Sequence, residues 1–150
     1  GIISISLALE LKNAKIIATD ISPDALKYAK INKDKFQVDI ELIESNYLDK
    51  VNGDFDIIIS NPPYIAANYP LDKWVLSEPK TALIGGQIGD EILKDIINLA
   101  KSRAKYLICE MGYDQRESMK NYLDKLDFQS EFYTDLAGLD RGFIAYNKGK

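Results

Sequence analysis

Apolar positions along the chain follow two spacings. Apolar residues every three or four positions are typical of a helix with one buried face, whereas short apolar runs and strict alternation are typical of strands. Helical spacing predicts helices over residues 2–11, 23–33, 88–102 and 114–126. Apolar runs and alternation predict strands over residues 15–19, 38–42, 56–60, 106–110, 128–134 and 142–146. The first helix is expected to be buried and to follow a glycine turn at Gly1.

Helices and strands alternate until the last two strands, which lie too close together for a helical crossover. Parallel neighbours need about a dozen connecting residues, so the final pair is expected to be antiparallel around a turn at Gly138. The pattern predicts an α/β fold: a mostly parallel twisted sheet with helices on both faces and a C-terminal antiparallel hairpin. Ser22 and Pro23 supply an N-cap and a first helical residue for the second helix.

Two segments depart from the regular alternation. The run Ile57-Ile58-Ile59 predicts a strand buried on both faces. Residues 61–87 contain every proline except Pro23 and predict a long loop with little regular structure. Long ordered loops in compact domains are usually functional.

Composition excludes several kinds of chemistry. The 150 residues predict one domain, and they contain no histidine and a single cysteine, Cys109, expected to be buried in its strand. These counts exclude a Ser–His–Asp triad, a Cys–His pair, the usual zinc sites and an internal disulfide, and they fit a reducing compartment. The net charge of −4 indicates no general basic surface for nucleic acid, although it does not exclude a local basic patch. No apolar run is long enough for a transmembrane helix, and no basic residue precedes the apolar N-terminal stretch as a signal peptide requires.

Polar residues stand at the ends of three predicted strands: Asp20, the segment starting at Asn61, and Glu110-Met111-Gly112. Ligands bind at the carboxyl ends of strands in open α/β sheets. A carboxylate at the position of Asp20 can accept the hydroxyls of a nucleoside ribose. The alternative is that Asp20 serves only its own loop.

Asn61-Pro62-Pro63-Tyr64 is the most specific motif in the chain, and we call it the NPPY segment. Proline holds the residue before it extended and offers a carbonyl without an N–H. With the amide oxygen of Asn61 and the ring of Tyr64, the segment can hold a planar group that bears an –NH2. The alternative is a stiff loop with a core tyrosine.

The motifs together resemble those of the HemK/PrmC family of S-adenosylmethionine-dependent methyltransferases. The matching segments run through almost the whole chain in order: Asp20, residues 60–65 (SNPPYI), Glu78-Pro79, Thr81-Ala82-Leu83, Gly85-Gly86, Glu110-Met111-Gly112 and residues 135–141 (DLAGLDR). The resemblance implies a Rossmann-like class I fold and a cytoplasmic enzyme. Its implied reaction transfers a methyl group from S-adenosylmethionine to the side-chain amide of the glutamine in the Gly-Gly-Gln motif of a peptide-chain release factor.

The resemblance also implies roles for individual residues. Catalytic roles fall to Asn61, Pro62 and Tyr64, which with Pro63 and Glu78 form the substrate contacts. The implied cofactor contacts are Gly1, Asp20, Ile21, Asn46, Tyr47 and Asn61. Asn46 stands where the family has an aspartate, so it can accept a hydrogen bond but carries no charge. No metal is implied.

The start of the chain departs from the family pattern. The family's glycine-rich cofactor loop lies before its first helix, and only Gly1 remains of it here. Residues 1–150 are therefore expected to be a catalytic domain truncated at its N-terminus, without its first strand and without the helical domain that recognises the release factor.

Alternatives to the glutamine methyltransferase remain. One is a nucleic-acid methyltransferase acting on the amino group of adenine or guanine, which the acidic balance disfavours. The other is an inactive truncated domain. Gly85-Gly86-Gln87 spells the release factor's own methylated tripeptide, but we interpret it as a local turn.

Overall fold

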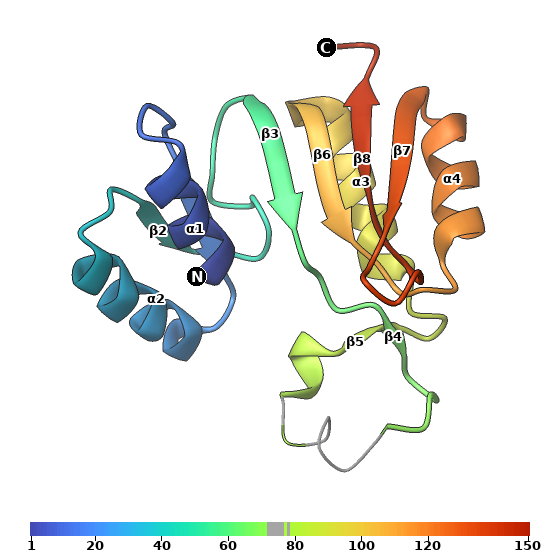
Figure 1. Cartoon of the computed structure of the whole chain (residues 1–150), viewed down its shortest axis with the longest axis horizontal. Helices are drawn as coiled ribbons and strands as arrows, with labels where there is room; N and C mark the ends of the chain where they lie inside the picture. The colour runs from blue at the N-terminus through green and yellow to red at the C-terminus, as the bar shows by residue number, and fades with distance from the viewer. Residues whose placement is uncertain (72–76, 78) are drawn as a thin grey trace. The chain divides into compact units, whose positions relative to one another are not determined.

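A computed structural model describes residues 1–71, 77 and 79–150 of the chain. The chain divides into two compact units, residues 1–53 and residues 54–150. Each unit has its own strands and helices and is described by itself (Figure 1).

The first unit is a parallel strand pair with two helices. Its elements are α1 (Ile2–Glu10), β1 (Ile17–Asp20), α2 (Pro23–Phe36) and β2 (Glu41–Glu44). Helix α2 packs on both strands and α1 packs on α2. The expected burial of α1 is limited to Ser4 and Ile5.

In the first unit, the sequence predicted the start of α2 correctly and the start of β2 incorrectly. The Oγ of Ser22 accepts a hydrogen bond from the N–H of Ala25 at 3.2 Å, so the predicted N-cap of α2 is confirmed. The strand predicted over 38–42 begins only at Glu41. Ile40 is buried just before this strand but is not paired in the β1–β2 ladder, so its burial extended the alternating pattern beyond the strand.

The second unit is built on a mixed sheet of order β3-β6-β8-β7. Its strands and the two helices that pack on it are β3 (Phe55–Ser60), β6 (Ala104–Glu110), β7 (Phe128–Thr134), β8 (Asp140–Asn147), α3 (Glu91–Arg103) and α4 (Arg116–Lys125). Strand β3 is parallel to β6, whereas β8 is antiparallel to both β6 and β7. The predicted C-terminal hairpin is confirmed.

One face of this sheet carries the core of the second unit. Alternate residues of β6 and β8 are buried there, among them Leu107, Cys109, Phe143 and Ala145. Helix α3 packs on β6 and α4 packs on β7, and Figure 1 shows α3 behind the strands. The burial of Cys109 is as expected. The expected burial of the isoleucine run on both faces is wrong, because Ile57 is 47% exposed on β3, an edge strand of this sheet.

The loop predicted over residues 61–87 has more regular structure than expected. It contains the short strands β4 (Ile65–Ala66) and β5 (Ile84–Gly86), which pair in parallel, and the 3-10 turn η2 (Lys80–Ala82). These elements are too short to leave a periodic pattern in the sequence. No helix within the described ranges is long and apolar enough to cross a membrane.

Candidate functional site

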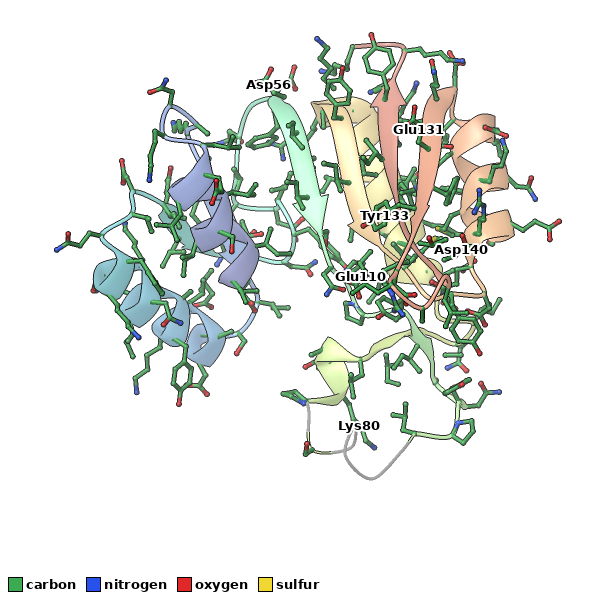
Figure 2. All side chains as sticks on the ribbon, viewed as in Figure 1. Asp56, Lys80, Glu110, Glu131, Tyr133 and Asp140 are labelled. Atoms are coloured by element: carbon green, nitrogen blue, oxygen red, sulfur yellow. The ribbon has the colours of Figure 1, made fainter. Side chains whose placement is uncertain are left out.

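The side chain of Tyr64 is held by residues from two other strands. Parallel pairing aligns Ser60 with Cys109, so the NPPY segment leaves β3 beside Glu110, which lies at the carboxyl end of β6 (Figure 2). The Tyr64 hydroxyl donates a 3.0 Å hydrogen bond to Oε1 of Glu110. The same hydroxyl accepts a hydrogen bond from Nη1 of Arg141 on β8 at 3.4 Å.

These contacts set the electrostatics around the phenol. Partial burial raises the pKa of Tyr64, and the neighbouring carboxylate of Glu110 raises it further, while Arg141 opposes the shift. Tyr64 is therefore a neutral hydrogen-bond donor at neutral pH. Arg141 in turn forms an ion pair with Asp135 at 2.7 Å, which lowers the pKa of Asp135 and raises that of Arg141.

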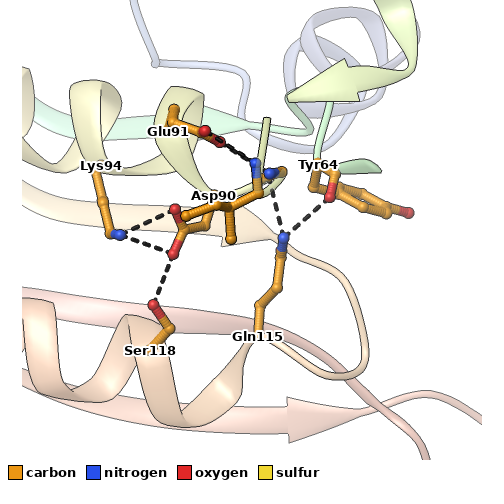
Figure 3. Close-up of polar contacts among 8 residues, drawn as sticks. Tyr64, Asp90, Glu91, Lys94, Gln115 and Ser118 are labelled. Carbon is orange, nitrogen blue, oxygen red and sulfur yellow. Dashed lines mark hydrogen bonds and ion pairs between the residues drawn. The ribbon is translucent and has the colours of Figure 1, made fainter. Parts of the chain in front are cut away.

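The main chain of Tyr64 is anchored separately by a buried amide. Nε2 of Gln115 donates to the carbonyl oxygen of Tyr64 at 2.9 Å and to that of Gly89 at 3.1 Å (Figure 3). Oε1 of Gln115 accepts from the N–H of Gly112 at 2.9 Å. One side chain thereby joins three loops that follow or precede strands of this unit.

Gly85 allows the NPPY segment to approach β5 closely. A Cβ atom built on Gly85 would lie 2.4 Å from the carbonyl oxygen of Gly89 and 2.6 Å from that of Pro63. No side chain fits between backbone atoms at such distances. The glycine pair at 85–86 belongs to strand β5, where Gly86 has φ +131°, so the expected local turn is wrong for these two residues.

The start of α3 is fixed beside the same loops (Figure 3). Glu91 accepts from the N–H groups of Ile88 and Gly89, at 2.9 and 2.8 Å, and these bonds lower its pKa. Asp90 is buried and bridges Lys94 and Ser118, which ties α3 to α4. The loop that Gln115 contacts at Gly89 is therefore itself anchored by hydrogen bonds.

Asn61 and Pro62 lie between this anchored region and the end of β3. The side chain of Asn61 is exposed and Pro62 is buried. Asn61 can accept a hydrogen bond through its amide oxygen and Pro62 through its carbonyl. The segment can therefore present acceptors to an incoming –NH2 group.

The predicted cofactor contacts all lie in the first unit, except Asn61. Asp20 ends β1 and is half-buried, and its Oδ1 accepts from the N–H of Ser22 at 2.9 Å, which fixes the carboxylate. Its backbone carbonyl accepts from the N–H of Ser45 at 3.1 Å, so the loops after β1 and β2 are joined. Asn46 and Tyr47 follow β2 at this same edge.

The remaining predicted residues differ in their surroundings. Asn46 donates through Nδ2 to Asp49 at 3.3 Å, so the bond uses the nitrogen end of its amide. Ile21 is 65% exposed. Tyr47 has a positive φ of 46°. Gly1 precedes α1, and a Cβ atom there would lie 2.7 Å from Cβ of Ala29, so this glycine lets α1 pack on α2.

Some expectations fall outside these contacts. Glu78 lies outside the described residues. Within the described ranges no cluster of three or more His, Cys, Asp or Glu side chains could hold a metal. Two open hollows of about 310 and 340 Å³ lie in the first unit around Lys15 and Asp39, at the amino end of its strands, away from the predicted contacts.

Sequence reasoning missed two residues that hold the NPPY segment. Gln115 carries no motif signal, because one buried glutamine at a helix start looks like a surface residue. Arg141 lies in the segment 135–141 that resembles the family, but its contact with Tyr64 joins residues 77 positions apart.

Several curated proteins with similar sequences are named release factor glutamine methyltransferase. The chain is 37% identical over 153 residues to the release factor glutamine methyltransferase of Aquifex aeolicus, covering 97% of this chain and 54% of that protein. It is 40% identical over 154 residues to the protein of the same name from Dictyoglomus turgidum, covering 94% of this chain and 54% of that protein. The resemblance to the HemK/PrmC family is confirmed, and the chain spans about half the length of these relatives.

Comparisons with solved structures and with family models also match this chain to methyltransferases. The crystal structure of ribosomal protein L11 methylase from Lactobacillus delbrueckii subsp. bulgaricus superposes with a TM-score of 0.71 at 25% identity, covering 99% of this chain and 65% of that one. The predicted α/β, Rossmann-like class I methyltransferase fold is therefore confirmed. The sequence profile of the family described as "MTS: Methyltransferase small domain" matches residues 1–76. The chain belongs to the methyltransferase small domain family.

Proposed function

We propose that residues 1–150 form the catalytic domain of an S-adenosylmethionine-dependent methyltransferase that modifies the glutamine of the Gly-Gly-Gln motif in a peptide-chain release factor. The observation that carries the proposal is the anchoring of the NPPY segment at the carboxyl end of β3, by Gln115 at its main chain and by Glu110 and Arg141 at its ring. The names of the similar proteins support the substrate. Release factors act in the cytoplasm, where we place the enzyme.

The residues of the first unit fit the adenosine part of the cofactor. The carboxylate of Asp20, oriented by the N–H of Ser22, can accept both ribose hydroxyls. Asn46 and Tyr47, at the neighbouring strand end, offer an acceptor and an aromatic face for adenine, with Ile21 and Gly1 as further contacts. When bound, S-adenosylmethionine supplies a methyl group on an activated sulfonium.

The second unit orients the nucleophile. An amide nitrogen is a poor nucleophile because its lone pair is delocalised into the carbonyl. The amide oxygen of Asn61 and the carbonyl oxygen of Pro62 accept its two N–H groups, which fixes the nitrogen and stabilises the positive charge that develops on it. Pro63 keeps the segment extended, and the ring of Tyr64 packs against the amide plane.

No histidine is needed for this reaction. The methylated amide nitrogen carries a positive charge and loses its proton readily to water. The chemistry therefore requires oriented acceptors and not a general base with a neutral pKa. This agrees with a sequence that contains no histidine.

A labelled methyl transfer assay tests the proposal. The protein is incubated with methyl-labelled S-adenosylmethionine and a purified release factor, and the label is located by peptide mass spectrometry. We expect one methyl group on the glutamine of the Gly-Gly-Gln motif, and none in a release factor whose glutamine is changed to alanine. Transfer to adenine or guanine amino groups instead would overturn the proposal. Absence of both transfer and calorimetric heat at millimolar cofactor would show an inactive domain.

A further inference from the structure

The hydroxyl of Tyr64 links the NPPY segment to the C-terminal hairpin. It donates to Glu110 at 3.0 Å and accepts from Arg141 at 3.4 Å. Arg141 lies in β8, near the turn that joins β7 to β8. The hairpin is thus in direct contact with a segment that is distant from it in the sequence.

The guanidinium of Arg141 is itself fixed by the turn. Its Nη2 and Nε donate to Oδ2 of Asp135, at 2.7 and 3.3 Å. Oδ1 of Asp135 accepts from the N–H groups of Ala137 and Leu139, at 2.9 and 3.1 Å. Only a planar guanidinium can hold this carboxylate with one edge and reach the phenol with another nitrogen.

We infer that Arg141 is a positioning residue, which holds the NPPY segment in its working geometry through the hydroxyl of Tyr64. The role assigned to it is indirect, because its hydrogen bonds go to Asp135 and to the hydroxyl of Tyr64. Small displacements of an orienting group cost large factors in rate. The expected effect on kcat rests on the proposed function. The expected effect on the structure of the NPPY segment does not.

A double-mutant cycle separates positioning from simple stabilisation of the hairpin. Arg141→Met keeps the aliphatic stem and removes the guanidinium, and Tyr64→Phe removes the hydroxyl. We expect Arg141→Met to lower kcat about tenfold, with KM for the release factor within about twofold. In the Tyr64→Phe background, we expect the same change to have almost no further effect. An equal loss in both backgrounds would overturn the inference.

Arg116 at the start of α4 offers a matched control, because its ion-pair partner Asp140 lies on the same hairpin. It forms an ion pair with Asp140 at 2.6 Å and lies over the ring of Phe132, whereas Arg141 bonds to Tyr64. Arg116→Met removes a guanidinium–aspartate pair of the same kind, so it reproduces any general effect on the hairpin. We expect its kcat to stay within about twofold of the wild-type value. A tenfold loss in this variant would also overturn the inference.

Hydrogen exchange provides a readout that does not depend on activity. The N–H groups of Ile65 and Ala67, next to Tyr64, donate to Leu83 and Gly86 at 2.9 Å each. We expect faster exchange of these amides in Arg141→Met than in Arg116→Met, and no further increase in the Tyr64→Phe background. If the wild-type protein transferred no methyl group, exchange would still decide the inference. Unchanged exchange in Arg141→Met would overturn it.

Discussion

Gln115 and Tyr64 are joined by a hydrogen bond between a buried side chain and a backbone carbonyl, 2.9 Å long and 51 residues apart in sequence. The same amide group also contacts Gly89 and Gly112. A single glutamine therefore connects the NPPY segment to the loops before α3 and after β6. The position of the candidate catalytic segment therefore depends on a residue that binds its main chain.

Gln115→Leu is expected to destabilise the second unit. The change removes the hydrogen-bond partner of two backbone carbonyls, of Tyr64 and Gly89, and of the N–H of Gly112. Each unsatisfied buried group costs roughly 1–3 kcal/mol. Allowing for partial access of water, we expect a loss of about 3 kcal/mol in the free energy of unfolding. Urea denaturation followed by circular dichroism measures it.

Gln129→Leu is the matched control for this change. Gln129 is exposed on β7, so the same substitution there removes no buried hydrogen bond. We expect a change within about 0.5 kcal/mol. Equal losses of unfolding free energy in the two variants would contradict the stabilising role assigned to the hydrogen bonds of Gln115.

Gly85→Ala is expected to displace the NPPY segment. The new methyl group would meet the carbonyl oxygens of Gly89 and Pro63 at 2.4 and 2.6 Å, and both are backbone atoms. We expect a lower urea midpoint and a loss of methyl transfer greater than the loss of stability explains. Gly149→Ala is the control, because its Cβ would lie 3.5 Å or more from any neighbour. A stable and fully active Gly85→Ala variant would contradict the close approach.

The sequence predicted the elements whose signals are local. Ser22 and Pro23 mark the start of α2 because a cap and a fixed φ act within one turn. The length of the last connection required an antiparallel hairpin. The exposure of Ile57 could not be predicted, because burial of a strand depends on which strands lie beside it and not on its own composition.

The candidate site was also predicted only in part, because some of its features are local in the sequence and others depend on long-range contacts. The NPPY segment is recognisable because its chemistry lies in four adjacent residues. Glu110 was placed at a strand end, and parallel pairing of β3 with β6 brings it to Tyr64. Gln115 and Arg141 reach Tyr64 across 51 and 77 positions, and no local pattern encodes such contacts.

Acid is expected to weaken the β7–β8 turn through Asp135. Its hydrogen bonds with Arg141, Leu139 and Ala137 hold its pKa below the ordinary value of 3.8. A lowered folded pKa stabilises the fold above the ordinary pKa, and this contribution is lost as the pH falls through the folded value. In urea titrations from about pH 6 to about pH 3, we expect the stability difference between wild type and Asp135→Asn to shrink.

A stability difference between wild type and Asp135→Asn that stayed constant down to the lowest pH would contradict the role of the ion pair. Arg141→Met is expected to remove most of the difference, because it removes the partner that lowers the pKa of Asp135.

Cys109 is expected to be unreactive in the folded protein. Burial raises the pKa of its thiol to about 12, so almost no thiolate is present at pH 8, and the core of β6 excludes reagents. An aromatic disulfide reagent is expected to react with Cys109 only as fast as the second unit unfolds. In urea, which unfolds the protein, we expect the thiol to react rapidly. Ser102→Cys adds a thiol at an exposed position of α3, which is expected to react at once. Fast reaction of the native wild-type protein would show that β6 opens without unfolding.

Asn61→Ala separates orientation of the amide from binding of the cofactor. The change removes one of the two acceptors proposed for the target –NH2, and loss of a preorganised group of this kind costs about 10²–10³ in kcat. The remaining cofactor contacts lie in the first unit, so we expect the affinity for S-adenosylmethionine to stay within about threefold by calorimetry. Asp20→Asn is the complementary variant: it weakens the ribose contact and leaves the NPPY segment intact, so we expect weaker cofactor binding. Equal loss of kcat and cofactor affinity in Asn61→Ala would contradict its role as an acceptor, since it would place Asn61 chiefly in the cofactor site.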